Sequence, residues 1–279
     1  MEMQSVHSDL ELARRLELAE GLSCARFVET RARVSPESGA CRTEIAGTYA
    51  MFDGPASPVT QTFGLGVLGD VSPAHLESIE AFFRERDSPV FHEVSPLAGV
   101  PVFQLLVKRG YKPTELTSVM YQPLDRLSTN RVESTAGGLI RVRGIDPTDA
   151  AERQLWAQVM ADGWGETPEL REFLLDLGGL LAAKEDSPSF IAEIDGQAIA
   201  VASLSLAGGV ALLAGACTIP AARQRGAQLA LLNTRLRYAA SHGCDLAMMC
   251  AAPGSSSQRN AERNGFRIAY TRTKWMLGA

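Results

Sequence analysis

Two arginines and a glycine lie at the tip of a predicted strand-to-helix turn, in the segment TIPAARQRGAQLALL that ends at Leu232. The first N–H groups of a helix have no intrahelical partner, and they carry the positive end of the helix dipole. Glycine lets an anion approach the main chain, and arginine adds charge-assisted hydrogen bonds to phosphate. Arg223, Arg225 and Gly226 therefore predict an anion site, and pyrophosphate is its natural ligand.

Other ligand classes lose support because their motifs are missing. The sequence has no GxxxxGK[ST] segment, and it has no GxGxxG followed by an acidic residue after a second strand. Nucleotide hydrolysis and dinucleotide redox chemistry are therefore disfavoured. The net charge of −5 and the pI near 5.5 argue against a nucleic-acid partner.

The cysteines favour neither a disulfide framework nor a zinc site. They are odd in number and scattered, with no CxxC pair: Cys24, Cys41, Cys217, Cys244 and Cys250. The N-terminus has a mixed-charge amphipathic pattern where a secretory signal would have an apolar core, and no apolar run approaches membrane-spanning length. We therefore predict a cytoplasmic protein with no metal and no membrane partner.

The elements around the turn alternate between helices and strands from residue 139 onward. A strand over 139–143 precedes a helix capped by Asp146 or Thr148, and a second helix begins at Pro168. Three strands then form a meander with turns at Asp195-Gly196 and Gly208-Gly209. A helix that ends at Gly243, a buried strand, a short helix capped by Ser256 or Ser257 and a final strand complete the order β-α-α-β-β-β-α-β-α-β.

A polar stretch rich in Ser, Thr and Gly divides the chain into two halves. We predict a first half over 1–124, a linker over 125–138 and a second half over 139–279. A shift of 155 residues places Gly110-Tyr111 on Gly265-Phe266, and the layout of helix, strand, Gly, helix and strand then matches from His75 to Tyr121. We interpret the halves as a tandem of two similar folds.

The same shift shows that the two halves differ in the residues at the predicted anion site. Residues Leu68, Asp70 and Val71 of the first half stand where the second half has its two arginines and its glycine. A carboxylate and a β-branched residue would repel pyrophosphate there, so we expect one cofactor site per chain, in the second half. His92 and Glu93 of the first half are either a functional pair or a half-buried strand end.

The segments TIPAARQRGAQLALL and NAERNGFRIAY resemble the acyl-CoA-binding core of the GNAT N-acetyltransferase superfamily. The resemblance implies an α/β fold with a mixed sheet, in two tandem acyl-CoA N-acyltransferase-like domains of which the second is complete. The superfamily's pyrophosphate loop has the form [RQ]-x-x-G-x-[GA], and here it reads Arg223, Gln224, Arg225, Gly226, Ala227 and Gln228. Gln228 thus replaces the last small residue. By the same resemblance, the backbone of Ala216, Cys217 and Thr218 pairs with the pantetheine arm of acetyl-CoA.

The catalytic groups are not identified by this resemblance. Family members often carry an Asn and a Tyr where this chain has Gly254 and Ala261, so the Tyr that would protonate the departing thiolate is missing. The remaining candidates for acid or base are Asp162, Glu166, Glu193, Cys250 and Tyr270.

The leading hypothesis is an acetyl-CoA-dependent N-acetyltransferase that acts on an amine of a small-molecule substrate. The alternative is a non-catalytic acyl-CoA-binding protein or sensor, and a third is a transferase of longer acyl chains. The sequence does not name the acceptor, and it leaves a homodimer open.

Overall fold

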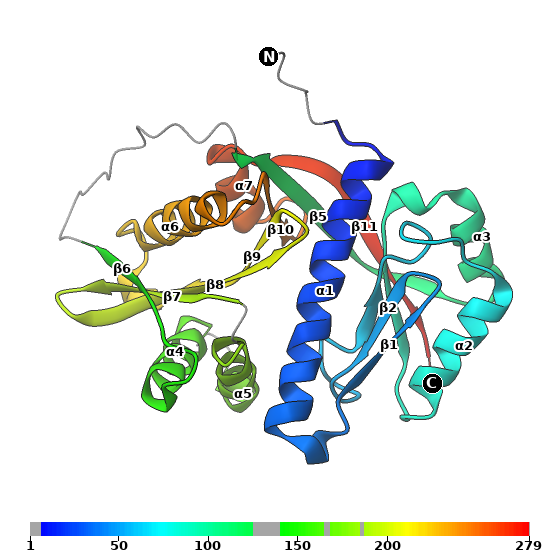
Figure 1. The fold of residues 1–279 in the computed structure, drawn as a ribbon, viewed down its shortest axis with the longest axis horizontal. Coiled ribbons are helices and arrows are strands. Elements are labelled where there is room, and N and C mark those ends of the chain that lie inside the picture. The colour runs from blue at the N-terminus through cyan, green and yellow to red at the C-terminus, as the bar shows by residue number, and fades with distance from the viewer. Residues whose placement is uncertain (1–6, 125–139, 165–167, 185–186, 279) are drawn as a thin grey trace. The chain divides into compact units, whose positions relative to one another are not determined.

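A computed structural model describes residues 7–124, 140–164, 168–184 and 187–278 of the chain (Figure 1). Its contacts divide the chain into two compact units. The first unit combines residues 1–122 with 248–279, and the second unit spans 123–247. The predicted linker and Glu166 lie outside the described residues, and the predicted domain division remains a prediction. The contacts group residues 248–279 with the first half of the sequence.

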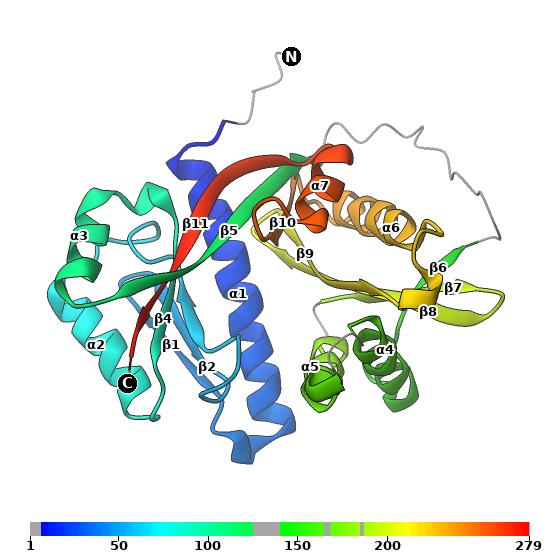
Figure 2. The ribbon, with the colours of Figure 1, turned by 180° about the vertical axis from the view of Figure 1, so that it is seen from behind.

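The first unit is built on a mixed sheet with the strand order β1-β2-β3-β4-β11-β5-β10, in which β3 and β4 are parallel. Helix α1 contacts β1, β2 and β3, while α2 contacts β1 and β4 (Figures 1 and 2). The elements are α1 (Leu10–Val34), β1 (Cys41–Ile45), β2 (Thr48–Phe52), β3 (Gln61–Phe63), α2 (Pro73–Arg84), β4 (Val90–Val94), α3 (Val100–Lys108), β5 (Lys112–Pro123), β10 (Leu246–Ala251), α7 (Ser256–Arg263) and β11 (Arg267–Leu277).

The last strand of the chain lies inside the sheet of the first unit. Strand β11 runs antiparallel to β4 on one side, where Thr273 faces Val94, and antiparallel to β5 on the other, where Thr271 faces Ser118. The order α2-β4-α3-β5 of the first half recurs as α6-β10-α7-β11, which is the layout that the repeat predicted. Neighbouring strands β4 and β11, and likewise β5 and β10, therefore come from opposite halves of the sequence.

Amphipathic helices supply the core of the first unit. Leu76, Ile79 and Phe83 recur at helical spacing along α2, and all three are fully buried. They pack with Val102 and Leu106 of α3 in one apolar cluster. Among the described helices, none is both long enough and apolar enough to cross a membrane.

The second unit is an antiparallel sheet with helices on both faces. Its strand order is β9-β8-β7-β6. Helices α4 and α5 lie on one face and α6 lies on the other (Figures 1 and 2). The elements are β6 (Arg141–Gly144), α4 (Ala150–Gly163), α5 (Arg171–Ala182), β7 (Ser189–Ile194), β8 (Gln197–Ala207), β9 (Val210–Thr218) and α6 (Ala227–Ser241), with short 3-10 turns at Pro168–Leu170 and Pro220–Ala222.

The predicted order of elements after residue 139 is confirmed, and so is the tight hairpin turn between β7 and β8. Both Asp195 and Gly196 have positive φ angles, 51° and 76°, as a type I′ turn requires. The mixed α/β fold class is confirmed as well.

Two predicted helix caps were wrong by a few residues. Asp149 caps α4, because the carboxylate of Asp146 instead accepts from the N–H and the hydroxyl of Thr148 in the preceding turn. Ser255 caps α7, and its hydroxyl accepts from the N–H of Gln258.

Candidate functional site

The predicted phosphate loop joins β9 to α6 in the second unit. The strand ends at Thr218, a 3-10 turn follows at Pro220–Ala222, and α6 begins at Ala227 with Gly226 as its N-cap residue. No side chain caps this end of α6. Its first N–H groups therefore remain available to an anion, with the helix dipole behind them.

The backbone of the loop has two left-handed residues. Gly226 has a φ angle of 91°, and Gln224 has a φ angle of 65°. Glycine adopts this conformation without steric cost, whereas a β-branched residue such as the valine of the first half would be strained. A Cβ atom added at Gly226 would lie 3.6 Å from Ile140 Cδ1, so the position is open and the requirement for glycine is conformational.

The two arginines of the loop differ in their surroundings. The guanidinium of Arg223 donates from Nη2 to the carbonyl oxygen of Gly163 at 3.2 Å, and from Nε to that of Thr218 at 3.5 Å. It thereby ties the loop to the end of α4. Arg225 is exposed, and within the described residues its side chain makes no hydrogen bond or ion pair. Of the two, Arg225 is the cation that is free to contact a phosphate.

Gln228, which departs from the superfamily pattern, has a defined contact. Its amide Nε2 donates to Thr218 Oγ1 at 2.7 Å, across the loop from the first turn of α6 to the end of β9. The longer side chain therefore closes the base of the loop, where a glycine or alanine would leave it open.

The three predicted pantetheine-binding residues follow a β-bulge in β9. Ala216 is half-buried, and Cys217 and Thr218 are buried. The Cys217 thiol contacts the carbonyl oxygens of Val159 and Met160 in α4. Burial raises the pKa of this thiol to about 12, so it stays protonated at neutral pH. Its side chain is part of the core, which leaves only its backbone for a ligand.

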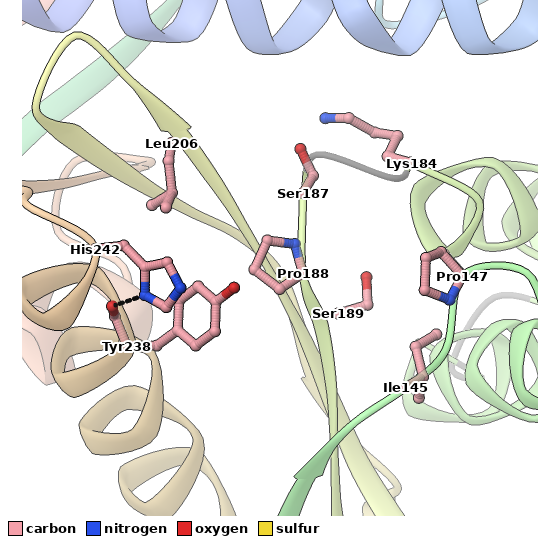
Figure 3. Close-up of a pocket in the computed structure, with 10 residues that line it drawn as sticks. Ile145, Pro147, Lys184, Ser187, Pro188, Ser189, Leu206, Tyr238 and His242 are labelled. Carbon is pink, nitrogen blue, oxygen red and sulfur yellow. Dashed lines mark hydrogen bonds between the residues drawn. The ribbon is translucent and has the colours of Figure 1, made fainter.

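A cavity of about 400 Å³ lies elsewhere in the second unit, near the C-terminal end of α6 (Figure 3). Tyr238 and His242 form one side, with their rings stacked at a centroid separation of 3.8 Å. Lys184 and Ser189 lie on the other side. Because the phosphate loop is at the opposite end of this helix, roughly 20 Å away at 1.5 Å per residue, the cavity is separate from the predicted cofactor site.

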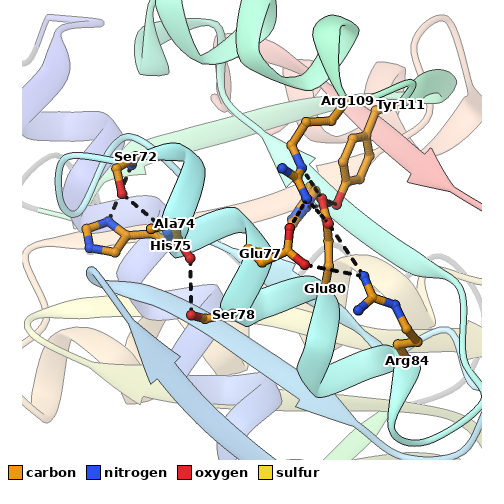
Figure 4. Close-up of polar contacts among 10 residues, drawn as sticks. Ser72, Ala74, His75, Glu77, Ser78, Glu80, Arg84, Arg109 and Tyr111 are labelled. Atoms are coloured by element: carbon orange, nitrogen blue, oxygen red, sulfur yellow. Dashed lines mark hydrogen bonds and ion pairs between the residues drawn. The ribbon is translucent and has the colours of Figure 1, made fainter.

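The corresponding helix of the first half begins differently. The N-terminus of α2 is closed by a capping box, in which Ser72 Oγ accepts from the His75 N–H at 3.2 Å and His75 Nδ1 accepts from the Ser72 N–H at 3.3 Å (Figure 4). These side chains occupy amide groups that an anion would need. The contrast with the uncapped N-terminus of α6 supports the expectation of one cofactor site, which remains a prediction.

Two predicted acid–base candidates are engaged in ion pairs. Asp162 Oδ1, in α4, accepts from Arg171 Nη1 at 2.8 Å. Glu193, in β7, accepts from Arg143 Nε at 2.9 Å, and this arginine also contacts Glu152 at 2.6 Å. In both cases the carboxylate is already engaged by an arginine of its own unit. Neither residue is thus placed as a free general base.

The other two described candidates meet in a buried polar cluster of the first unit, which we call the Arg272 cluster. It comprises Glu17, Glu20, Glu93, Cys250, Tyr270 and Arg272. The guanidinium of Arg272 donates to both oxygens of Glu20, at 2.6 and 2.8 Å, and its Nε lies 2.8 Å from Glu93. Cys250 contacts Glu20 at 3.4 Å. Burial raises the pKa of Cys250 and that of Tyr270 well above their usual values, so both keep their protons at neutral pH.

Glu17 of the Arg272 cluster was not indicated by the sequence. Its Oε1 accepts from the Tyr270 hydroxyl at 2.8 Å, while its Oε2 is buried and has no hydrogen-bond partner among the described residues. Burial raises the pKa of Glu17 to about 7, against the opposing charge of Arg272. Perturbed carboxyls concentrate at functional sites, so Glu17 is a candidate acid or base. No local pattern could reveal it, because Glu17 and Tyr270 are 253 residues apart.

His92 and Glu93 do not form a pair. Their side chains take opposite directions from β4. His92 Nδ1 lies 2.6 Å from Thr62 Oγ1 and its Nε2 lies 3.0 Å from the Tyr111 hydroxyl, whereas Glu93 contacts Arg272. Burial lowers the pKa of His92 to about 3, so its ring is neutral. Both residues are buried, where the sequence suggested a half-buried strand end.

Comparison with known proteins addresses the second half directly. Residues 127–253 match the sequence family described as "Acetyltransferase (GNAT) domain". These residues form a GNAT acetyltransferase domain. The resemblance found in the loop and in the order of elements is confirmed. A search of curated protein sequences finds no match to the chain.

Solved structures agree with the GNAT domain at the level of the fold. A GCN5-related N-acetyltransferase from Kribbella flavida is 17% identical with a TM-score of 0.59, over 91% of this chain and 95% of that chain. A GCN5-related N-acetyltransferase from Sphaerobacter thermophilus is 17% identical with a TM-score of 0.55, and the match covers 78% of this chain and 71% of that chain. A tandem GNAT protein from the clavulanic acid biosynthesis pathway is 15% identical with a TM-score of 0.54, and the match covers 73% of this chain and 68% of that chain.

Proposed function

We propose that this protein is an acetyl-CoA-dependent N-acetyltransferase that transfers the acetyl group to an amine of a small-molecule acceptor. In this reaction the amine nitrogen attacks the thioester carbonyl, a C–N bond forms, the C–S bond breaks, and CoA leaves as the thiolate. The excess proton of the attacking amine passes to a base or to water. The GNAT acetyltransferase domain supports this class of reaction.

One observation carries the cofactor part of the proposal. The N-terminus of α6 has no side-chain cap, its N-cap Gly226 is in the left-handed region, and the exposed Arg225 lies beside it. These groups suit a pyrophosphate, because backbone N–H groups and a guanidinium both donate to its oxygens. In the proposal, Arg223 and Gln228 maintain the shape of the loop, and Ala216, Cys217 and Thr218 offer backbone groups to the pantetheine arm.

Calorimetry with acetyl-CoA tests this site. The variant Arg225→Glu with Gly226→Val introduces the charge and bulk found in the first half. We expect it to bind at least about 30-fold more weakly, on the scale of about 2 kcal/mol for charge-assisted hydrogen bonds. Arg237→Glu, a charge reversal at an exposed arginine later in α6, is the matched control and should retain binding. Equal binding by the double variant and wild type, or no binding by wild type, would contradict the proposal.

A non-catalytic acyl-CoA-binding protein or sensor is the second candidate function. It is favoured by the engagement of Asp162 and Glu193 in ion pairs and by the raised pKa values of Cys250 and Tyr270. The two functions differ in the release of thiol. We expect free CoA to accumulate when the protein is incubated with acetyl-CoA and a panel of primary amines. Binding without thiol release across the panel would favour the sensor.

A further inference from the structure

Arg235 of α6 is a buried cation without an acidic partner. Among the described residues its side chain donates to backbone carbonyl oxygens: from Nη1 to Ser203 at 3.1 Å and Ala214 at 3.5 Å, and from Nε to Leu231 at 3.3 Å. The residue is 4% exposed, and within the described part of the chain no carboxylate pairs with it. Burying an unpaired charge is costly unless its hydrogen bonds are satisfied, so the position of Arg235 requires an explanation.

Arg235 contacts the carbonyl oxygens of Ser203 in β8 and Ala214 in β9, and these two residues lie at a β-bulge. Ser203 of β8 faces Ala214 of β9, and Val201 faces Cys217. Two steps along β8 therefore correspond to three along β9, so β9 has one extra residue at this point. Gly215 accommodates it with a φ angle of 57°. A bulge leaves backbone groups outside the regular ladder, and side chains can serve as their hydrogen-bond partners.

Side chains supply those partners at the bulge. The Ser203 hydroxyl donates to the Ala214 carbonyl at 3.1 Å, and Arg235 contacts the carbonyls of both residues. A guanidinium has five N–H donors in a fixed plane, so one arginine can serve both strands at once. The bulge is also packed tightly, since a Cβ atom at Gly215 would lie 3.0 Å from Ser203 Oγ and 3.5 Å from Trp156 Cη2.

The residues predicted to contact the cofactor follow the bulge directly. Ala216, Cys217 and Thr218 are the last residues of β9, and the short 3-10 turn at Pro220–Ala222 separates them from the phosphate loop that begins at Arg223. Helix α6 therefore contacts the proposed cofactor-binding segment twice, through its N-terminus at the phosphate loop and through Arg235 at the bulge.

We infer that Arg235 is a positioning residue for acetyl-CoA: by holding the carbonyl groups of Ser203 and Ala214, it fixes the bulge and with it the course of the backbone over Ala216–Thr218. The inference rests on the proposed function, because the segment it orders is the one assigned to the pantetheine arm. Arg235 itself does not contact the cofactor.

The test compares acetyl-CoA affinity with local backbone order in three variants. Arg235→Met removes the donors and the charge, Arg235→Lys keeps the charge with a single ammonium group, and Arg237→Met is the control on an exposed arginine of the same helix. We expect at least a tenfold weaker Kd for Arg235→Met, a three- to tenfold weaker Kd for Arg235→Lys, and wild-type affinity for the control. Amide hydrogen exchange should be faster over residues 214–218 in both Arg235 variants and unchanged in β7.

The outcomes separate the two proposals. A wild type that does not bind acetyl-CoA overturns the proposed function and this inference with it. A wild type that binds, together with folded Arg235→Met protein within twofold of its Kd, overturns the inference alone. If Arg235→Met does not fold, Arg235→Lys decides: a Kd within twofold of wild type, or faster exchange throughout the unit, overturns the positioning role.

Discussion

Trp275 of β11 lies opposite His92 of β4 on one side and opposite Pro113 of β5 on the other. The C-terminal strand is therefore a central strand in the sheet of the first unit, between two strands from the first half of the sequence. Its removal would leave two strand edges unpaired and would expose the core residues that it covers.

Deletion of residues 267–279 should abolish cooperative unfolding of the first unit. The expected result is loss of that unit's share of the thermal transition by circular dichroism, together with aggregation, because β4 and β5 lose their common partner. A synthetic peptide of residues 266–279 added in trans should restore part of the transition. A truncated chain that melts like wild type would refute the structural role of β11.

Gly163→Ala should destabilise the second unit. The added Cβ would lie 2.5 Å from Cys217 Sγ and 2.9 Å from its Cβ, so α4 and β9 would have to separate. We expect a loss of about 1–3 kcal/mol in the free energy of unfolding, measured with urea. Gly179→Ala in α5 is the matched control: nothing lies within 4 Å of its Cβ position, and there alanine should be neutral or stabilising by up to about 1 kcal/mol. Equal effects at the two glycines would contradict the packing argument.

Glu17→Gln should change how stability depends on pH. Burial raises the pKa of Glu17 to about 7 in the folded protein, above the unfolded value near 4.5, so the folded state holds this proton more tightly. The contribution of Glu17 to stability is therefore complete below about pH 4.5 and is lost as the pH rises through 7. The free energy of unfolding should be measured with urea at pH 5 and at pH 8 for wild type and for Glu17→Gln. Relative to wild type, the variant should be more stable at pH 8 than at pH 5 by about 1–3 kcal/mol. Glu11→Gln, at an exposed position of the same helix, should show no such gain.

Arg109→Met should be strongly destabilising because it leaves the buried Glu80 with only a longer ion pair, at 3.8 Å, to the exposed Arg84. Glu80 is 2% exposed, and it accepts hydrogen bonds from Arg109 and from the Tyr111 hydroxyl (Figure 4). Loss of one partner from a buried ion pair costs about 3–5 kcal/mol. Glu77→Gln tests the exposed carboxylate on the same arginine and should cost much less, because solvent screens an exposed ion pair. Comparable losses in the two variants would show that burial of Glu80 does not decide the effect.

Local patterns in the sequence predict much of the second unit. Apolar periodicity and the Asp195-Gly196 turn give the order of its elements, because these signals arise within a few residues of each other. The cap of α4 was misplaced because three candidate residues lie within four positions, and only the folded turn reveals that Asp146 is engaged with Thr148. The assignment of the loop at Arg223–Gln228 to phosphate binding stays a prediction.

Long-range pairing was not readable from the sequence. The position of β11 between β4 and β5 depends on strand partners that are distant in sequence, such as Val94 for Thr273 and Ser118 for Thr271, and no periodicity encodes a partner. The contact between Glu17 and Tyr270 has the same origin. Arg235 did leave a signal, since it falls on the apolar face of α6 between Leu232 and Leu236, both of which are buried. A charged residue at such a position indicates a specific internal partner.

The order of strands also bears on how the chain folds during synthesis. A ribosome makes β4 and β5 long before β11, so the sheet of the first unit cannot close until the C-terminal residues have left the exit tunnel. Throughout that interval the nascent chain presents open strand edges, which are the sites where chaperones bind and where aggregation begins.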